Sequence, residues 1–291
     1  MTTLIPTNPH QIEDLIRLAL LEDIGEGDHS TLSCVPQSGT NQAHLLVKQE
    51  GVIAGVAVAL KIFEETARQY GFQPLEIDVR IQDGFSVKKG DIVLTVAGSS
   101  QLILMAERLV LNTMQRMSGI ATYTSMMAAL IADLPVKLLD TRKTTPNFRL
   151  FEKMAAQIGG ANNHRMGLYD MIMLKDNHID YAGGITAAIN STNDYLEKTG
   201  KNLSIEIETR NLKEVDEVLQ NGRVNTIMLD NFSLFDLAEA VRRIDGRFET
   251  EASGNITEST IREVALTGVD GISSGAIIHQ ARSLDLSLKA F

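Results

Sequence analysis

The stretch LSIEIETRNLKEVDEVLQNGRVNTIMLDN, residues Leu203–Asn231, decides the fold class of this chain. It begins with an apolar run at Leu203–Ile207 and ends with a second run at Thr226–Leu229, and the residues between the runs have the spacing of an amphipathic helix. A strand, a helix and another strand in this order are typical of a parallel βαβ unit. The acidic residues Glu208 and Asp230 follow the two runs directly.

The same alternation continues on both sides of this stretch. Four further apolar runs, separated by helix-like residues, are Val136–Leu139, Met171–Leu174, Phe248–Ala252 and Val269–Ile272. Their spacing of about 20 to 35 residues fits successive βα units on one parallel sheet. Polar groups follow all six runs, and TIM-type barrels collect their active sites at this carboxyl end of the strands. A doubly wound open sheet stays as the alternative, because its site also lies at the carboxyl ends of the strands.

The N-terminal third of the chain predicts a smaller α/β domain. Asn8 is the expected N-cap of a helix that begins at Pro9 and ends near Gly25, and a second helix is expected at Ala59–Tyr70. Around this second helix, strand-like runs occur at Ala43–Val47, Val52–Val56, Glu76–Ile81 and Ile92–Val96.

A long helix is predicted to follow, from Gln101 to Met117, with Gly119 ending it. We place the domain boundary at this helix. The chain then consists of an N-terminal α/β sandwich domain, residues 1–116, and an α/β barrel domain, residues 117–291.

The composition excludes some classes of partner. With 27 Lys and Arg against 37 Asp and Glu, the net charge of −10 argues against nonspecific binding to nucleic acid or to an anionic membrane. The longest strongly apolar stretch, Gly51–Leu60, is far shorter than the roughly 20 residues that span a bilayer. The single cysteine, Cys34, fits a reducing compartment, and we interpret it as a small buried residue. These features predict a soluble, cytoplasmic protein.

Basic residues nevertheless gather near the predicted strand ends. The group consists of Arg142, Lys143, His164, Arg165 and Lys175. If these charges lay together at the carboxyl end of the predicted sheet, they would repel one another unless an anionic ligand neutralised them. Forked guanidinium groups suit planar carboxylates. The group therefore predicts a site for anionic substrates.

Two acidic strand ends supply the opposite charge. Glu208 and Asp230 could hold Mg²⁺, ribose hydroxyls or a developing positive charge. Glu206 is expected to point to the opposite face of its strand from Glu208.

The last two strand ends combine hydroxyl groups with glycine. The segments Ser253-Gly254-Asn255 and Ser273-Ser274-Gly275 could bring backbone N–H groups close to an anion, and we name them together the phosphate cradle. Two ordinary βα turns would have a similar composition. Their position after the final two runs favours the cradle.

These residues belong to a series of motifs that covers nearly the whole chain. In the C-terminal half the motifs are Leu139–Pro146, Asn163–Leu168, Lys175–Ile179, Leu229–Asn231, Glu251–Gly254 and Thr267–Asp270. Upstream they are Glu22–Asp28, Glu107-Arg108, Leu111-Asn112 and Gln115–Thr122. In order and number, the series resembles that of the quinolinate phosphoribosyltransferases.

The resemblance implies an N-terminal α/β sandwich, an incomplete C-terminal α/β barrel, and a homodimer or higher homo-oligomer with shared active sites. It also implies a reaction in which quinolinate and phosphoribosyl pyrophosphate give nicotinate mononucleotide, pyrophosphate and carbon dioxide with Mg²⁺. For quinolinate, it implies that Arg142, His164 and Arg165 hold the two carboxylates, with Thr141 in the same site. Arg108 would come from the neighbouring subunit.

On the side of the ribosyl donor, the resemblance implies four catalytic residues. Lys143 and Lys175 would contact substrate anions, while Glu208 and Asp230 would serve the ribose and the metal. The phosphate cradle would bind the 5′-phosphate. Because the pyridine nitrogen attacks with its own lone pair, no covalent enzyme intermediate is expected.

The chain departs from the common form of the family in several places, which include Ser274 and Ile278 near His279 and three loop positions. Asn147 and Asn255 stand where glycine is frequent, and Ala161 replaces a third glycine. None of these changes removes a charged residue of the site.

Three alternatives stay open at this point. The first is a related phosphoribosyltransferase that uses nicotinate or another ring acid. The second is a Schiff-base aldolase with Lys175 as nucleophile. The arginines would have no evident function in such an enzyme. The third is a carrier module, because Asp83–Asp91 resembles the turn of lipoyl and biotinyl domains. Lys88 and Lys89 lie within that turn, before Gly90, which favours a structural role.

Overall fold

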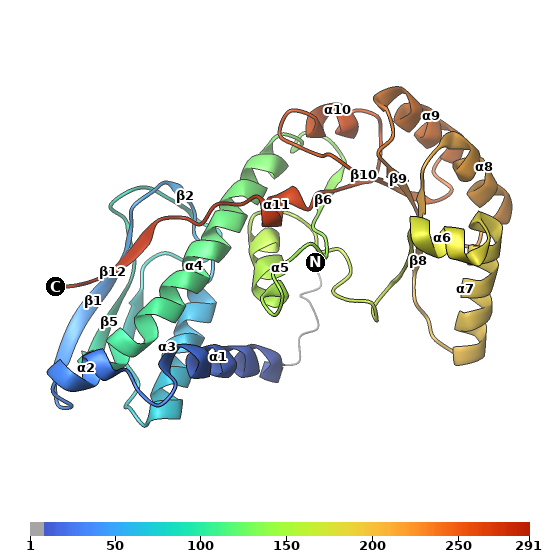
Figure 1. Ribbon diagram of the computed structural model, residues 1–291. Coiled ribbons are helices and arrows are strands. Elements are labelled where there is room, and N and C mark those ends of the chain that lie inside the picture. The colour runs from blue at the N-terminus through green and yellow to red at the C-terminus, as the bar shows by residue number, and fades with distance from the viewer. Residues whose placement is uncertain (1–8) are drawn as a thin grey trace. The chain divides into compact units, whose positions relative to one another are not determined.

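The structure is a computed structural model that describes residues 9–291, so the expected N-cap Asn8 lies outside it (Figure 1). The chain forms two compact units. We name the first the N-terminal unit; it comprises the chain up to Ser125 together with Thr144–Gly160 and Ile278–Phe291. The second, the barrel unit, comprises Met126–Lys143 and Ala161–Ile277.

An antiparallel sheet forms the centre of the N-terminal unit. Its four strands are β12 (Leu286–Ala290), β1 (Thr40–Val47), β5 (Ile92–Ser99) and β3 (Glu76–Val79), in this order across the sheet. A separate pair consists of β2 (Gly51–Val52) and β4 (Ser86–Val87). The C-terminal strand β12 pairs with β1, as Figure 1 shows, so the end of the chain completes the first unit.

Five helices accompany these strands in chain order. They are α1 (Pro9–Ile24), α2 (His29–Cys34), α3 (Val56–Tyr70), α4 (Ser100–Ala129) and α5 (Arg149–Ile158). The expected end of the first helix near Gly25 is confirmed. Cys34 is exposed at the end of α2, so its predicted burial is wrong.

The start of α3 corrects a predicted strand and explains the segment Asp83–Asp91. The strand expected at Val52–Val56 stops at Val52, because Val56 is already the first residue of α3. The carboxylate of Asp83 accepts hydrogen bonds from the backbone N–H groups of Val56 (2.8 Å) and Ala57 (3.3 Å). These two groups have no acceptor within the helix. The segment therefore has the structural role that the sequence favoured.

The predicted end of the long helix at Gly119 is wrong. Helix α4 continues through this residue to Ala129. A Cβ atom at Gly119 would lie 2.0 Å from the carbonyl oxygen of Arg282. The glycine therefore permits close approach of another segment and does not end the helix.

A parallel sheet of six strands forms the barrel unit. The strands are β6 (Lys137–Leu139), β7 (Ile172–Leu174), β8 (Ile205–Thr209), β9 (Thr226–Asp230), β10 (Glu249–Ser253) and β11 (Gly271–Ser273). Their helices are α6 (Asp176–Ala182), α7 (Ile185–Thr199), α8 (Leu212–Asn221), α9 (Leu234–Ile244), α10 (Ile261–Ala265) and α11 (Ala276–His279). Figure 1 shows α7, α8 and α9 side by side along the outside of this sheet.

The strand order distinguishes a barrel from a doubly wound sheet. From β7 to β11 each strand pairs with the next in the chain, and β11 then pairs with the first strand, β6. A doubly wound sheet reverses direction at a switch point, which does not occur here. In the described part of the chain β6 and β7 do not pair, and an isolated bridge between Leu139 and Asn162 lies beside β6 instead. The expected incomplete α/β barrel is thereby confirmed.

The two units are interleaved along the chain and do not coincide with a single cut between residues 116 and 117. One cause is the pairing of β12 with β1. Another is Arg116 of α4, which donates to the Glu152 carboxylate of α5 and to the carbonyl oxygens of Ile278 and Ala281. Across residues 9–291, no helix has the length and apolarity that crossing a membrane requires.

Candidate active site

The register of the parallel strands places the acidic residues on one face of the barrel sheet. Glu208 pairs with Met228, which pairs with Glu251, and Asp230 pairs with Ser253. Because alternate residues of a strand share a face, Glu206 and Glu208 point the same way. The expectation that Glu206 points to the opposite face is therefore wrong.

Lys175 and Glu208 meet at the carboxyl ends of neighbouring strands. Lys175 follows β7 and is the N-cap residue of α6. Its Nζ lies 3.3 Å from Oε2 of Glu208, whose side chain is buried while that of Lys175 is half exposed. This pair confirms that two of the predicted residues lie together.

Asp230 belongs to a hydrogen-bonded chain that sequence reasoning recognised only in part. Its Oδ1 accepts from Ser253 Oγ (2.6 Å) and its Oδ2 accepts from Asn231 Nδ2 (2.6 Å). The Oδ1 of Asn231 accepts in turn from Asn255 Nδ2 (3.1 Å). Asn231 was not among the predicted site residues, although its place beside a strand-end acid was a signal. A Cβ atom at Gly254 would lie 2.2 Å from Asn231 Oδ1. This series of hydrogen bonds therefore requires glycine at position 254.

The two segments of the phosphate cradle follow adjacent strands. Ser253 ends β10, Ser273 ends β11, and these strands are hydrogen-bonded to each other. Ser273 and Ser274 are buried, and the Ser274 backbone N–H donates to the carbonyl oxygen of Leu139 (3.0 Å). The structure therefore brings both segments to one edge of the sheet.

The arginines predicted to bind carboxylates lie near each other. Burial lowers the pKa of the Arg165 guanidinium, and the positive charge of Arg142 lowers that pKa further. Arg165 is 9% exposed and its Nη1 donates to the carbonyl oxygen of Met171 (3.3 Å). Lys143 is exposed, and its backbone N–H donates to Thr141 Oγ1 (3.0 Å) in the turn after β6.

His164 lies in the segment that runs beside β6. Its backbone N–H donates to the buried carboxylate of Asp140 (2.8 Å). Its Nε2 lies 2.9 Å from Oε2 of Glu206 and 3.4 Å from Oε2 of Glu251. Burial by itself lowers the pKa of His164, but the two carboxylates outweigh burial and raise the pKa to about 10. Burial also raises the pKa of Glu206.

Sequence reasoning missed that Glu206 and Glu251 lie against His164. The signal that could have found them is the period of the strand, because Glu206 precedes Glu208 by two residues and Glu251 precedes Ser253 by two. Both carboxylates are buried.

Two family models match the chain consecutively. The N-terminal domain of quinolinate phosphoribosyl transferase matches residues 28–118, and the C-terminal domain matches residues 120–289. The chain belongs to the quinolinate phosphoribosyltransferase family.

Relatives of known name agree with this membership in the quinolinate phosphoribosyltransferase family. Quinolinate phosphoribosyltransferase (decarboxylating) 1b of Nicotiana tabacum is 45% identical over 98% of this chain and 84% of its own length. The probable nicotinate-nucleotide pyrophosphorylase (carboxylating) of Synechocystis sp. is 42% identical, over 96% of this chain and 92% of its own. The crystal structure of NadC from Streptococcus pyogenes superposes with a TM-score of 0.89 at 37% identity, covering 99% of this chain and 100% of that one.

One residue expected of a quinolinate phosphoribosyltransferase lies in the other unit. Arg108 is exposed on α4, in the N-terminal unit, whereas the remaining predicted site residues belong to the barrel unit. Its contribution to the site of a neighbouring subunit stays a prediction.

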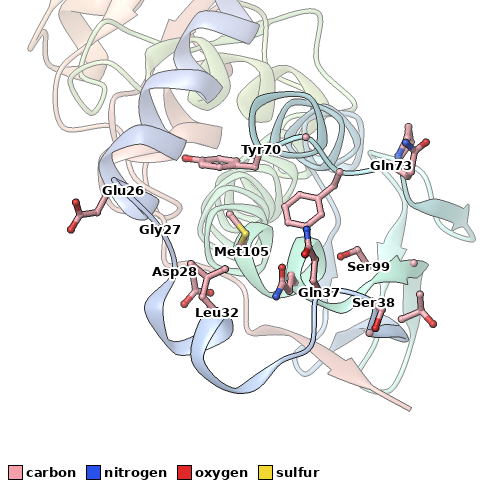
Figure 2. Close-up of a pocket in the computed structure, with 17 residues that line it drawn as sticks. Glu26, Gly27, Asp28, Leu32, Gln37, Ser38, Tyr70, Gln73, Ser99 and Met105 are labelled. Atoms are coloured by element: carbon pink, nitrogen blue, oxygen red, sulfur yellow. The ribbon is translucent and has the colours of Figure 1, made fainter.

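The N-terminal unit also contains a pocket of about 630 Å³ that holds none of the predicted site residues. It lies between the connection of α1 to α2, the end of α3 and the start of α4. Figure 2 shows Tyr70 and Met105 at this pocket and the Glu26 carboxylate directed away from it.

Proposed function

We propose that this chain transfers the phosphoribosyl group of phosphoribosyl pyrophosphate to quinolinate with decarboxylation. The products are nicotinate mononucleotide, pyrophosphate and carbon dioxide, in de novo NAD biosynthesis. The observation that carries this proposal is the conjunction, in the barrel unit, of a basic group, an acidic pair and a hydroxyl-rich cradle at the strand ends. The names of the relatives support the same reaction.

The phosphate cradle and the acidic pair form the donor half of the site. The cradle would bind the 5′-phosphate through its hydroxyl groups and through backbone N–H groups other than that of Ser274, which donates to Leu139. Glu208 and Asp230 would face the ribose, where their charge stabilises the positive charge that develops on the anomeric carbon.

Mg²⁺ is proposed as the metal, and the residues fit it. Mg²⁺ is usually held by one or two carboxylates together with substrate phosphates and water. Glu208 and Asp230 supply two carboxylates from adjacent strands on one face of the sheet. When bound with the donor, the ion would neutralise charge on the departing pyrophosphate.

The basic group forms the acceptor half. Arg142 and Arg165 would hold the carboxylates of quinolinate with His164 and Thr141 beside them, while Lys143 and Lys175 would contact substrate anions. Burial and then repulsion from Arg142 lower the pKa of Arg165, and a dianionic ligand would relieve the repulsion.

Positioning accounts for most of the chemistry in this proposal. The pyridine nitrogen forms a bond to the anomeric carbon as the bond to pyrophosphate breaks. The ring nitrogen is then cationic, so the ring accepts the electron pair left when the adjacent carboxylate departs as carbon dioxide. A proton then takes the place of that carboxylate.

Release of pyrophosphate and carbon dioxide from purified protein tests the proposal. We expect both products only when quinolinate, phosphoribosyl pyrophosphate and Mg²⁺ are all present. Consumption of nicotinate in place of quinolinate would instead establish the related phosphoribosyltransferase. Borohydride trapping of a covalent adduct on Lys175 would support the aldolase.

Two substitutions test the assignment of residues. Lys143→Ala and Glu208→Ala should each remove most turnover and leave the unfolding temperature nearly unchanged, because strand-end residues face the site and not the core. Activity near that of the unsubstituted enzyme in both variants would contradict the assignment.

Two finer points belong to this proposal. A homodimer or higher homo-oligomer with shared sites is proposed from the family resemblance, with Arg108, which is exposed in the N-terminal unit, as the residue that reaches the neighbouring subunit. A cytoplasmic location is proposed from the single cysteine, while relatives are named as chloroplastic and mitochondrial.

A further inference from the structure

A buried cluster of three titratable side chains lies below the strand-end site. Glu206 precedes Glu208 by two residues and Glu251 precedes Ser253 by two, so both carboxylates lie one step deeper along the same inner face of the sheet. His164 enters this cluster from the segment beside β6. The proposed chemistry uses neither carboxylate.

We propose that Glu206 and Glu251 are positioning residues for the quinolinate half of the site, acting by holding in one orientation the imidazole of His164, which is itself predicted to hold a quinolinate carboxylate. This inference rests on the proposed function, since it names residues that act on the same acceptor site.

The ring of His164 is held at both nitrogens. Nε2 lies within reach of the Oε2 atoms of Glu206 (2.9 Å) and Glu251 (3.4 Å), while Nδ1 accepts the backbone N–H of Arg165 (2.7 Å). A third contact holds the backbone, because Asp140 accepts the His164 N–H. In the neutral ring Nε2 carries the proton and Nδ1 accepts from Arg165. In the imidazolium Nε2 still donates to the carboxylates, but Nδ1 also carries a proton and no longer accepts from Arg165.

The contact at Nδ1 links the cluster to substrate binding. If the ring turned away from the carboxylates, the Arg165 backbone N–H would lose its acceptor in a buried place, where an unpaired donor is costly. In the neutral ring, the ring orientation and the Arg165 backbone are therefore coupled. The charge of Glu206 also favours the charged guanidinium of Arg165.

The surroundings of both carboxylates direct their hydrogen bonding toward His164. The Oε1 atoms of Glu206 and Glu251 are buried and have no hydrogen-bond partner. Each carboxylate therefore has its hydrogen bonding concentrated in the Oε2 atom that faces His164. Two buried carboxylates side by side would be expensive unless the imidazole stood between them.

The same three residues could ligate a metal ion, because their ligand atoms lie within 4.8 Å of one another. The 2.9 Å separation of His164 Nε2 and Glu206 Oε2 is the length of a hydrogen bond with a proton between the atoms. We therefore favour the positioning role and make the metal an outcome of the test.

Isosteric substitutions distinguish an effect on quinolinate binding from an effect on binding of the ribosyl donor. Glu206→Gln and Glu251→Gln keep the side-chain volume and remove the charge that holds the ring. We expect each to raise the KM for quinolinate by about tenfold to a hundredfold, as misplacement of a binding group does, while the KM for phosphoribosyl pyrophosphate changes less than twofold. The matched control is Glu249→Gln, which makes the same change on β10 at an exposed position and should alter neither constant.

Several results would overturn the inference. An unchanged quinolinate KM in both variants would do so, and so would an equal rise in both KM values, which indicates a general loss of structure. A stoichiometric metal ion in the purified enzyme that both variants lack would show a metal site instead. If the wild-type enzyme shows no quinolinate-dependent release of pyrophosphate, the proposed function itself fails, which distinguishes the two failures.

Nitrogen NMR of the unsubstituted enzyme tests the same point if the variants do not fold. The chain has six histidines, and the spectrum of His164→Gln identifies the signal of this ring. We expect a proton on Nε2. A neutral ring with its proton on Nδ1 would contradict the arrangement.

Discussion

At the scale of single residues, two asparagines stand where the family resemblance implies glycine. Asn147 has a φ of 61° and Asn255 a φ of 51°, which is the left-handed region that glycine adopts most easily. Asparagine enters this region more readily than other residues with a Cβ atom. The substitutions therefore keep the loop conformations that glycine would provide.

A pair of substitutions at Asn255 tests this reasoning. Asn255→Ala should lower the free energy of unfolding by about 1 kcal/mol, because alanine is strained at this φ. Asn255→Gly should be nearly neutral and serves as the matched control. Urea unfolding of both variants measures the difference. Equal stability of the two variants would show that the backbone conformation is not the constraint.

The raised pKa of His164 predicts how stability depends on pH. Because the folded-state pKa of about 10 exceeds the ordinary value of 6.5, proton binding stabilises the folded protein. The contribution is complete below pH 6.5 and is lost as the pH rises toward 10. We expect the free energy of unfolding to fall over this interval more steeply in the wild type than in His164→Gln. Parallel pH profiles of urea unfolding for the two proteins would contradict this prediction.

At the scale of elements, α4 binds α5 and the loop before it through contacts that are not visible in its own sequence pattern. Arg116 donates to Glu152, which is fully buried and also accepts from the backbone N–H and hydroxyl of Thr145. These bonds hold α5 and the loop before it against α4. A buried carboxylate keeps its charge at low cost only with such partners.

Gly119 gives a prediction for the same helix. Gly119→Ala should lower the free energy of unfolding by about 2 to 3 kcal/mol, because the added methyl group would overlap the carbonyl oxygen of Arg282. In an exposed helix the same change would be stabilising, since alanine is the better helix former. Thermal unfolding measures the effect, with Met126→Ala at an exposed position of α4 as the control. A stabilised Gly119→Ala variant would show that residues 282–283 do not approach the helix.

At the scale of the whole molecule, the chain passes between its two units several times, and the predicted site residues are divided between them. Arg108 belongs to the N-terminal unit, while Lys175 and the other predicted residues belong to the barrel unit. If the site is shared between subunits, Arg108 of one chain serves the barrel of another.

Mixing two inactive variants tests this arrangement. Arg108→Ala and Lys175→Ala should each be nearly inactive, but reassociated mixtures should regain about a quarter of wild-type activity, because half of the dimers are hybrids with one intact site of two. The steady-state rate after mixing and subunit exchange is the measurement. Mixtures as inactive as the separate variants, despite proven exchange, would place Arg108 in the site of its own chain.

The sequence by itself determined the fold class and most of the proposed site. Apolar runs at strand spacing, each followed by polar residues, were sufficient because period and turn chemistry are local properties. Lys175 with Glu208, and Asp230 with Ser253, were expected together and are in contact.

Only the tertiary structure decided the remainder, because it depends on segments that are distant in sequence. Gly119 has the local signature of a helix end, and only the approach of Arg282 shows why glycine is needed within α4. Glu206 and Glu251 became parts of the site only through His164, which reaches them from a segment that no strand pattern predicted. The closure of β11 onto β6 likewise selected the barrel over the open sheet. A hydrophobic pattern records which face of an element is buried, whereas the partner of that face follows from the path of the whole chain.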